Sequence, residues 1–586
     1  MRSLAATLLL ILSASATAFT PDLRDLDGLP LHVAPVAAVA KQIAATENLK
    51  GRGPAPFAVL VDLPVALDGG RWDKPTPGMQ RWRARVYSAG ARSLLMAFEQ
   101  FELPAGATLR LYDVTGNTVH GPYTRADHTP EGGLWTPIVP GETAVIELQV
   151  AAGQRDQVRL RLASLGHAYK NVADLGSSGR CNIDTACSLG DDWRNEIRSV
   201  VKLQIPFGRA VGLCTGTLIN NLRQDDTPYV LTADHCEIGS SGSPASGVVA
   251  YWNFQNSVCA GADNADDIQA QTGTTLIADD RGTDFTLLRL NTPPSASFNV
   301  YYAGFDAGGT GGTSGVGIHH PQGDAKKISR YARALIRDSV QIEFSGPNIP
   351  AWQVPQWDEG TTEPGSSGSG LWNQSRRIVG TLSGGAAACV GSVDNNEPDF
   401  YARLDAQWTA NAAADGQLKA WLDPDNTGAT GIAGRNATTA VAPVLQNDAR
   451  TVSGNSAAIS IDVLANDPAG LTLVSVGSPT QGGSASVVGN QVRYVPAAGF
   501  SGTETFSYTA RSGSGPAGSA IVTITVTPAG GTTGSTTGGT TGSTTGGATT
   551  GSGSGGGGGG GMPAGALLAL GLIVLWRRSL TTRRNG

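Results

Sequence analysis

The sequence predicts a modular all-β protein. Of its 586 residues, 79 are glycine and only 15% are charged, a composition typical of turn-rich β-modules. Runs that alternate between apolar and polar residues recur along the chain, and turn residues separate them. A chain of this length exceeds one domain, so we expect three or more.

The first 18 residues are predicted to form a secretory signal peptide. Arg2 gives a positive start, residues 4–12 an apolar core, and residues 16–18 a small-residue cleavage site. The apolar run is too short to span a membrane. We therefore expect an exported protein.

Residues 19–175 contain no cysteine and show three clear alternating runs, at 81–87, 108–112 and 144–150. Turn residues such as Pro104-Ala105-Gly106 lie between them. This pattern predicts a β-sandwich over 19–175.

All six cysteines lie between Cys181 and Cys389. An even number in an exported chain predicts three disulfides within one domain, although spacing alone leaves the pairing open. No pair has Cys-x-x-Cys spacing, so a metal site is not expected. We also expect no cofactor. The net charge of -6 is mild, and no basic tract is interleaved with aromatic residues, so nucleic acid is not an expected partner.

Residues 363–370, Glu-Pro-Gly-Ser-Ser-Gly-Ser-Gly, form a turn that suits a nucleophile. A serine hydroxyl needs a base to take its proton, and backbone N–H donors for the oxyanion that forms on the attacked carbonyl. Glycines allow the close backbone approach that such donors require. Ser367 lies in the middle of the turn, and the apolar segments 370–372 and 378–382 that follow are predicted strands.

Two upstream stretches supply the partners of a serine nucleophile. His235 lies in Leu-Thr-Ala-Asp-His-Cys after a β-like run, and Asp284 stands at the head of an alternating strand at 283–290. The order His235, Asp284, Ser367 fits the chymotrypsin-like triad and differs from the subtilisin and α/β-hydrolase orders. The backbone N–H groups of Gly365 and Ser367 are the predicted oxyanion hole.

These motifs resemble those of trypsin-fold serine proteases, most closely the bacterial lysyl endopeptidases. The matching stretches lie within residues 176–432 and are 181–184, 214–221, 231–236, 251–253, 284–288, 318–321, 362–369 and 399–401. The resemblance implies a chymotrypsin-like double β-barrel over 176–432, with the triad in the cleft between two six-stranded antiparallel barrels. It also implies three disulfides, Cys181–Cys389, Cys187–Cys259 and Cys214–Cys236.

The resemblance further implies which residues select the substrate. Asp399 matches the carboxylate that selects lysine in these enzymes, and a buried carboxylate attracts either Lys or Arg. Thr362, Ser383 and Gly384 complete the predicted specificity pocket. Ser383 stands where the closest family members carry a His, which leaves strict lysine selection open.

Ser366 replaces the Asp that most trypsin relatives pair with a new N-terminus. We therefore expect activation by removal of residues 19–175 as a propeptide that aids folding and covers the active site. A permanent accessory domain is the alternative. The predicted cleavage point is Lys170 or near Gly176.

His319 and His320, as strand neighbours, point to opposite faces and are expected to be structural.

The C-terminal part predicts a spacer and a sorting tail. Residues 438–528 resemble the immunoglobulin- or cadherin-like repeats of bacterial surface proteins, and 529–561 form a flexible Gly/Thr/Ser linker. Residues 562–586 combine a short apolar run with terminal arginines and resemble GlyGly-CTERM sorting tails of Gram-negative bacteria. A permanent single-pass anchor is the alternative.

We expect a monomeric serine endopeptidase, secreted or held at the cell surface, that is made as a precursor and cuts after Lys, with Arg left open. The expected partners are protein or peptide substrates, the chain's own propeptide, and the export and C-terminal sorting machinery. Membrane contact is expected only through residues 562–578. The alternatives are a protease of relaxed or different specificity, an esterase, and a catalytically inactive surface-binding protein.

Overall fold

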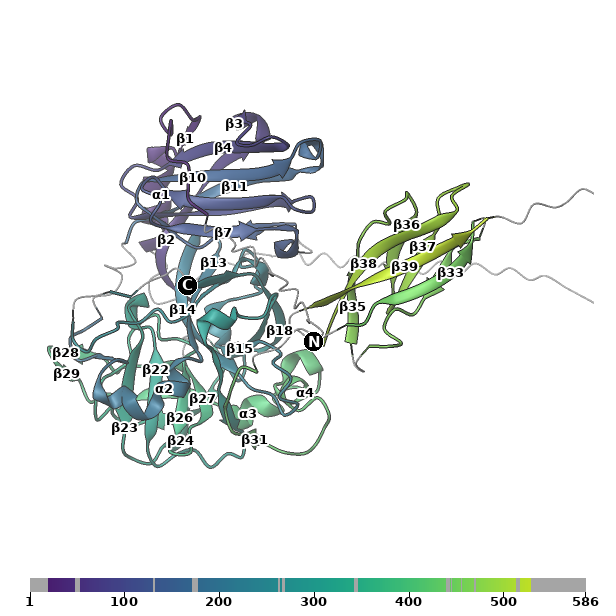
Figure 1. The fold of residues 1–586 in the computed structure, drawn as a ribbon. Coiled ribbons are helices and arrows are strands. Elements are labelled where there is room, and N and C mark those ends of the chain that lie inside the picture. Colours follow the sequence, from purple (N-terminus) through teal and green to yellow (C-terminus); the bar gives the residue numbers. More distant parts are fainter. Residues whose placement is uncertain are drawn as a thin grey trace, which may run out of the picture. The chain divides into compact units, whose positions relative to one another are not determined.

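The computed structural model describes residues 19–47, 53–129, 132–170, 178–261, 264–265, 269–341, 346–438, 443, 445–454, 456–467, 471–512 and 517–528. The predicted signal peptide, Gly176, and the linker and tail at 529–586 lie outside these residues. Figure 1 shows strands throughout and only short helices, which confirms the all-β fold class. Within the described ranges, no helix is both long enough and apolar enough to cross a bilayer.

Two packed sheets form the predicted N-terminal sandwich (Figure 1, purple and blue). One sheet has the order β1 (Leu31–Val33), β4 (Met79–Tyr87), β10 (Thr143–Ala151), β6 (Thr108–Asp113) and β7 (Val119–Tyr123), with β3 (Arg71–Asp73) on β4. The other contains β2 (Ala55–Ala66), β11 (Arg159–Ala168) and β5 (Ser93–Glu102), with the short β8 (Leu134–Trp135) and β9 (Val139–Pro140) on β5. Alternate residues of both sheets meet in one apolar core, as the alternating runs predict. Helix α1 (Val36–Glu47), which we did not predict, adds Val39 to that core.

The first barrel of the central region contains six antiparallel strands of a 12-stranded sheet. Their order is β16 (Val249–Tyr251), β13 (Val200–Phe207), β14 (Ala210–Ile219), β15 (Tyr229–Thr232), β19 (Phe285–Leu290) and β18 (Thr274–Asp280), and β17 (Ala270–Thr272) pairs with β16 beside them. Every residue of β13 and β14 is buried, which explains why these strands lack an alternating pattern.

The second barrel contains six antiparallel strands of a ten-stranded sheet. Their order is β23 (Lys327–Tyr331), β22 (Gly315–His319), β26 (Gly370–Asn373), β27 (Arg377–Gly385), β30 (Asp399–Arg403) and β25 (Ile349–Val354). Strands β26 and β27 are the two predicted after the nucleophile turn. An apolar cluster that includes Leu287 of the first barrel and Ile318 of the second joins the two barrels.

The N-terminal sandwich and the first barrel share a continuous sheet. Strand β2 pairs antiparallel with the start of β14, with Val59 opposite Ala210, and the Leu60 N–H donates to the Arg209 carbonyl at 2.9 Å. Phe57 of β2 packs in one apolar cluster with Val211 of β14 and with residues of β16. Removal of the N-terminal sandwich would therefore expose both an unpaired strand edge and an apolar surface.

The described residues between 445 and 528 form a β-sandwich within the C-terminal module predicted at 438–528. Its sheets have the orders β33 (Asp448–Ser453), β39 (Gly518–Thr527), β38 (Gly502–Ser512), β35 (Leu471–Val476), and β34 (Ile459–Ile461), β37 (Gln491–Val495), β36 (Ser484–Val488). Val492, Phe506 and Val522 lie in its core.

We predict that Phe57→Ala loosens the start of β14 in the unprocessed chain. Loss of the buried ring should reduce the free energy of local opening by about 3 kcal/mol, because a buried Phe→Ala change leaves a cavity. Hydrogen exchange of the amides at 210–213 measures this opening, in a Ser367→Ala background that prevents self-cleavage. Phe506→Ala, in the core of the C-terminal sandwich, is the control and should leave these amides unchanged.

Candidate active site

The first barrel brings His235 and Asp284 together from neighbouring strands. His235 lies in a single helical turn, Asp234–Cys236, directly after β15, and Asp284 directly precedes β19. Since β15 and β19 are paired, with Thr232 opposite Thr286, the two side chains emerge at the same end of the barrel.

The Asp284 carboxylate orients the His235 ring. Its Oδ1 and Oδ2 each lie 3.0 Å from His235 Nδ1, and Oδ1 also accepts the His235 backbone N–H at 3.0 Å. This pairing places the ring proton on Nδ1 and leaves Nε2 as the base. Burial disfavours the imidazolium form, but the neighbouring carboxylate outweighs burial, and the pKa of His235 is raised above its ordinary value.

Ser383 also binds the triad carboxylate. Its hydroxyl, on β27 of the second barrel, donates to Asp284 Oδ2 at 2.5 Å. We predicted Ser383 as a pocket residue, whereas the structure directs its side chain to Asp284. The spacing of the motifs gave no signal for this contact, because it joins residues 99 positions apart.

The nucleophile turn depends on two glycines in the left-handed region. Gly365 has φ +98° and Gly368 has φ +80°. A Cβ atom at Gly365 would lie 2.9 Å from the His320 carbonyl, and one at Gly368 would lie 2.6 Å from the Thr215 carbonyl and 2.8 Å from the Ala233 nitrogen. This close approach sets the turn directly against the segment that carries His235.

Hydrogen bonds fix the backbone on both sides of Ser367. Thr215 N donates to the Ser367 carbonyl at 2.8 Å, and Gly368 N donates to the Leu382 carbonyl at 2.9 Å. Among the described residues, the N–H groups of Gly365 and Ser367 donate to no protein group, as an oxyanion hole requires. The same residues show no Ser367–His235 hydrogen bond, a contact that often tightens only when substrate binds.

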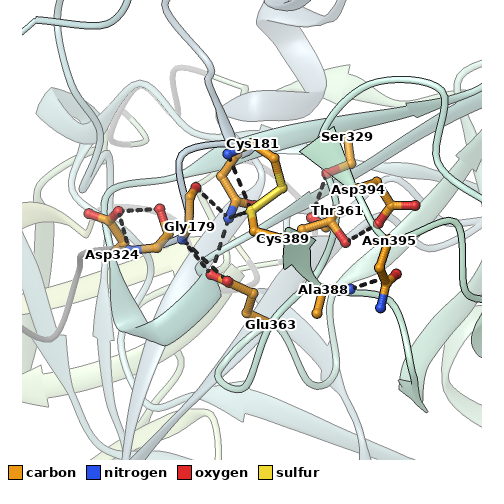
Figure 2. The surroundings of a disulfide bond; sticks show 12 residues. Gly179, Cys181, Asp324, Ser329, Thr361, Glu363, Ala388, Cys389, Asp394 and Asn395 are labelled. Carbon is orange, nitrogen blue, oxygen red and sulfur yellow. Dashed lines mark hydrogen bonds between the residues drawn. A yellow bond between two sulfur atoms is a disulfide. The ribbon is translucent and has the colours of Figure 1, made fainter. Parts of the chain in front are cut away.

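Cys214–Cys236 ties the His235 turn to β14, and Cys187–Cys259 is the second disulfide. Figure 2 shows the third, Cys181–Cys389, beside the nucleophile turn. All three pairs are those that the family resemblance implies. Next to Cys181, the Gly179 N–H donates to the Glu363 carboxylate at 3.0 Å (Figure 2).

Asp399 is the buried carboxylate of the predicted specificity pocket. It is 1% exposed, and its Oδ2 accepts from Trp357 Nε1 at 2.7 Å and from Thr362 Oγ1 at 2.8 Å. Burial raises the pKa of Asp399 to about 6, although these two donors favour the charged form.

Gly385 and Trp357 are site residues that the sequence analysis missed. Gly385 lies opposite Asp399 in the β27–β30 pair, and a Cβ there would lie 2.2 Å from Asp399 Oδ1. Glycine at this position therefore keeps space open beside the carboxylate. In the sequence, only the Leu-Ser-Gly-Gly stretch at 382–385 indicated that Gly385 could belong to the site. Gly384, the predicted pocket residue before Gly385, is half-buried, and a Cβ added there would meet no atom within 4 Å.

A cleft of 490 Å³ opens beside the triad. His235 and Asp284 line it, together with three further carboxylates and one guanidinium, from Asp234, Glu237, Asp279 and Arg281. Burial, followed by the charges of Asp284 and Asp279, raises the pKa of Asp234 to about 6. No group of His, Cys, Asp and Glu in the described part of the chain is arranged to hold a metal ion.

We predict that Ser383→Ala lowers kcat/KM about tenfold, because a hydrogen bond to a charged group is lost from a buried carboxylate. Asp284 should then interact more strongly with His235, so the acidic limb of the pH profile should move to higher pH. Measurement of kcat/KM against pH tests both effects. An unchanged profile would contradict the structural assignment.

Three parts of the chain match known protein families. Residues 175–402 match the family model of the lysyl endopeptidase C-terminal domain, and residues 65–169 match that of the lysyl endopeptidase N-terminal domain. Residues 440–527 match a bacterial Ig domain. A lysyl endopeptidase from Pseudomonas aeruginosa is 27% identical over 401 residues, which cover 62% of this chain and 82% of that protein.

Solved protease structures are similar to part of the chain at lower identity. The active form of the Rv3671c protease from M. tuberculosis is 20% identical, with a TM-score of 0.27, and the match covers 41% of this chain and 89% of that one. The protease Anisep from Arthrobacter nicotinovorans is 18% identical, with a TM-score of 0.27, over 38% of this chain and 97% of that one. On the sequence matches, residues 65–169 and 175–402 are related to the two domains of lysyl endopeptidases, and the chain is a serine endopeptidase.

Proposed function

We propose that this chain is a secreted precursor protease that hydrolyses peptide bonds on the carboxyl side of Lys. Ser367 attacks the scissile carbonyl, His235 takes its proton and later gives it to the leaving amine, and Asp284 holds the imidazole. The N–H groups of Gly365 and Ser367 stabilise the oxyanion. The buried carboxylate of Asp399 is the observation that supports the choice of a cationic side chain.

Two features favour a lysine ammonium next to Asp399. The Asp399 carboxylate is 1% exposed and so has little hydration, and a bound cation would stabilise its negative charge in place of water. Thr362 and Trp357 both bind Oδ2, while Gly385 leaves room on the side of Oδ1. The acidic lining of the 490 Å³ cleft beside His235 also favours cationic segments of a substrate.

Maturation by cleavage after Lys170 fits the proposed specificity. Lys170 is exposed and lies two residues after β11, the last strand of the N-terminal sandwich. A cut there would leave β2 and its pairing partner β14 on two different polypeptides. The alternative point near Gly176 lies outside the described residues. Export through the signal peptide, and release or surface retention through the tail at 562–586, complete the proposal.

The decisive experiment is digestion of an unfolded protein by the activated enzyme, with mass spectrometry of every cut site, beside Asp399→Asn. We expect cuts after Lys and at least a 100-fold loss of kcat/KM for Lys substrates in the variant, since the ammonium would lie buried and unpaired. Cuts after both Lys and Arg would show a relaxed pocket. Cuts unrelated to charge would overturn the role of Asp399. Loss of all cutting in Ser367→Ala is the control for the nucleophile.

A pH series separates Asp399 from His235. Protonation of either group lowers activity in acid. Protonation of His235 affects every substrate, whereas protonation of Asp399 affects only cationic ones. The ratio of kcat/KM for a Lys peptide to that for its norleucine analogue should therefore fall about tenfold per pH unit below about pH 6, where Asp399 becomes neutral. A ratio that stays constant between pH 5 and 7 would contradict this assignment. The Asp399→Asn variant should show a small, constant ratio.

A further inference from the structure

His319 joins the nucleophile turn to the second barrel through contacts that the triad does not use. It is the last residue of β22, and Ser329 lies on the paired strand β23. Ser366, the residue before the proposed nucleophile, reaches the ring from the turn. All three side chains are 0% exposed, so each polar atom depends on a protein partner.

Four hydrogen bonds form one chain through the imidazole. Glu363 N donates to Ser366 Oγ at 3.3 Å, and Ser366 Oγ lies 2.8 Å from His319 Nδ1. On the other side of the ring, His319 Nε2 lies 3.0 Å from Ser329 Oγ, which donates to the Thr361 carbonyl at 2.7 Å. The contact between Ser329 and Thr361 is visible in Figure 2. These four hydrogen bonds therefore hold the turn at Thr361, Glu363 and Ser366.

The acceptor at one end of this hydrogen-bond chain, the Thr361 carbonyl, fixes where every proton lies. A carbonyl can only accept, so the single hydroxyl proton of Ser329 is committed to Thr361. Ser329 Oγ must then accept a proton from His319 Nε2. The neutral ring has no second N–H, so Nδ1 accepts the hydroxyl proton of Ser366.

Only the neutral ring satisfies this arrangement. An imidazolium would direct an Nδ1–H at Ser366 Oγ and leave the Ser366 proton without its acceptor. Burial, followed by the charge of Lys327, lowers the pKa of His319 to about 3, which keeps the ring neutral at all working pH values. The ring is thus a fixed structural connector and not a proton carrier.

We propose that His319 is a positioning residue which, as its Nε2–H tautomer, holds Ser366 and thereby aims the Gly365 and Ser367 N–H groups at the oxyanion. The proposal rests on the assignment of Ser367 as nucleophile. His319 touches neither substrate nor reacting atoms. Its effect should therefore appear in kcat, because the oxyanion forms only in the transition state, and not in KM.

Two matched substitutions test the two sides of the His319 ring separately, the contact with Ser366 and the contact with Ser329. The amide oxygen of His319→Asn takes the place of Nδ1 and can still accept from Ser366. The amide nitrogen of His319→Gln takes the place of Nε2, keeps the contact with Ser329 and loses the acceptor for Ser366. We expect His319→Asn to keep kcat within about threefold, and His319→Gln to lower it by about 10- to 100-fold at unchanged KM, since small misplacements cost that much.

Three measurements make the test decisive. Steady-state kinetics with a Lys peptide should give the split between kcat and KM, and thermal unfolding should show that both variants fold. Equal losses in both variants, or a loss in neither, would overturn the role of His319. Nitrogen NMR of the chain labelled with ¹⁵N-histidine reads the tautomer directly, with the His319 signal assigned by its absence in His319→Asn. A proton on Nδ1 would overturn the proposal whether or not the chain cleaves peptides. Activity that survives in Ser367→Ala would instead overturn the nucleophile assignment and the oxyanion role that depends on it, and would leave the assigned tautomer and its hold on Ser366 standing.

Discussion

Asp284 places a negative charge where almost no water reaches it, since its side chain is 2% exposed. A carboxylate in such a position requires donors, and the two barrels supply them jointly, from His235 on the first and Ser383 on the second. Loss of either partner would leave a buried charge poorly satisfied. The carboxylate that orients the proposed base therefore also joins the two barrels, through its hydrogen bond with Ser383. The left-handed backbone of Asp284, with φ +49°, persists because these contacts hold it.

The nucleophile turn is held by backbone contacts to both barrels. Thr215 of the first barrel binds the Ser367 carbonyl, and Leu382 of the second binds the Gly368 N–H. Side chains would prevent this packing at Gly365 and Gly368, which explains the Gly/Ser composition of the turn. The turn thus reaches a defined shape without any charged group at its centre, since Ser366 occupies the buried position before the nucleophile and binds a neutral ring.

Strand β27 contacts both of the buried carboxylates, Asp284 and Asp399. Ser383 contacts the triad carboxylate, and two residues later Gly385 lies opposite Asp399. A shift of this strand would move both contacts together. The strand therefore links the surroundings of the two buried carboxylates, which differ in environment. Asp284 binds the His235 imidazole, whereas Asp399 is held by the neutral donors Trp357 and Thr362.

Much of the architecture could be predicted from local patterns, because alternation and turn residues report strands directly. The two sandwiches and the strands around the nucleophile turn are examples, since their faces differ in polarity. Strands β13 and β14 are buried on both faces and gave no such signal. The shared sheet formed by β2 and β14 was also not predicted, because strand pairing between distant segments leaves no local trace.

The sequence by itself determined the chemistry: a serine in a glycine turn, a histidine and an aspartate in a diagnostic order, and cysteines confined to one domain. Only the tertiary structure decided which groups surround them. It directed Ser383 to Asp284, placed Trp357 on Asp399, and gave His319 two serine partners. The physical reason is that residue type fixes what a group can donate or accept, whereas its partner depends on strand register and barrel packing, which bring together residues far apart in the chain.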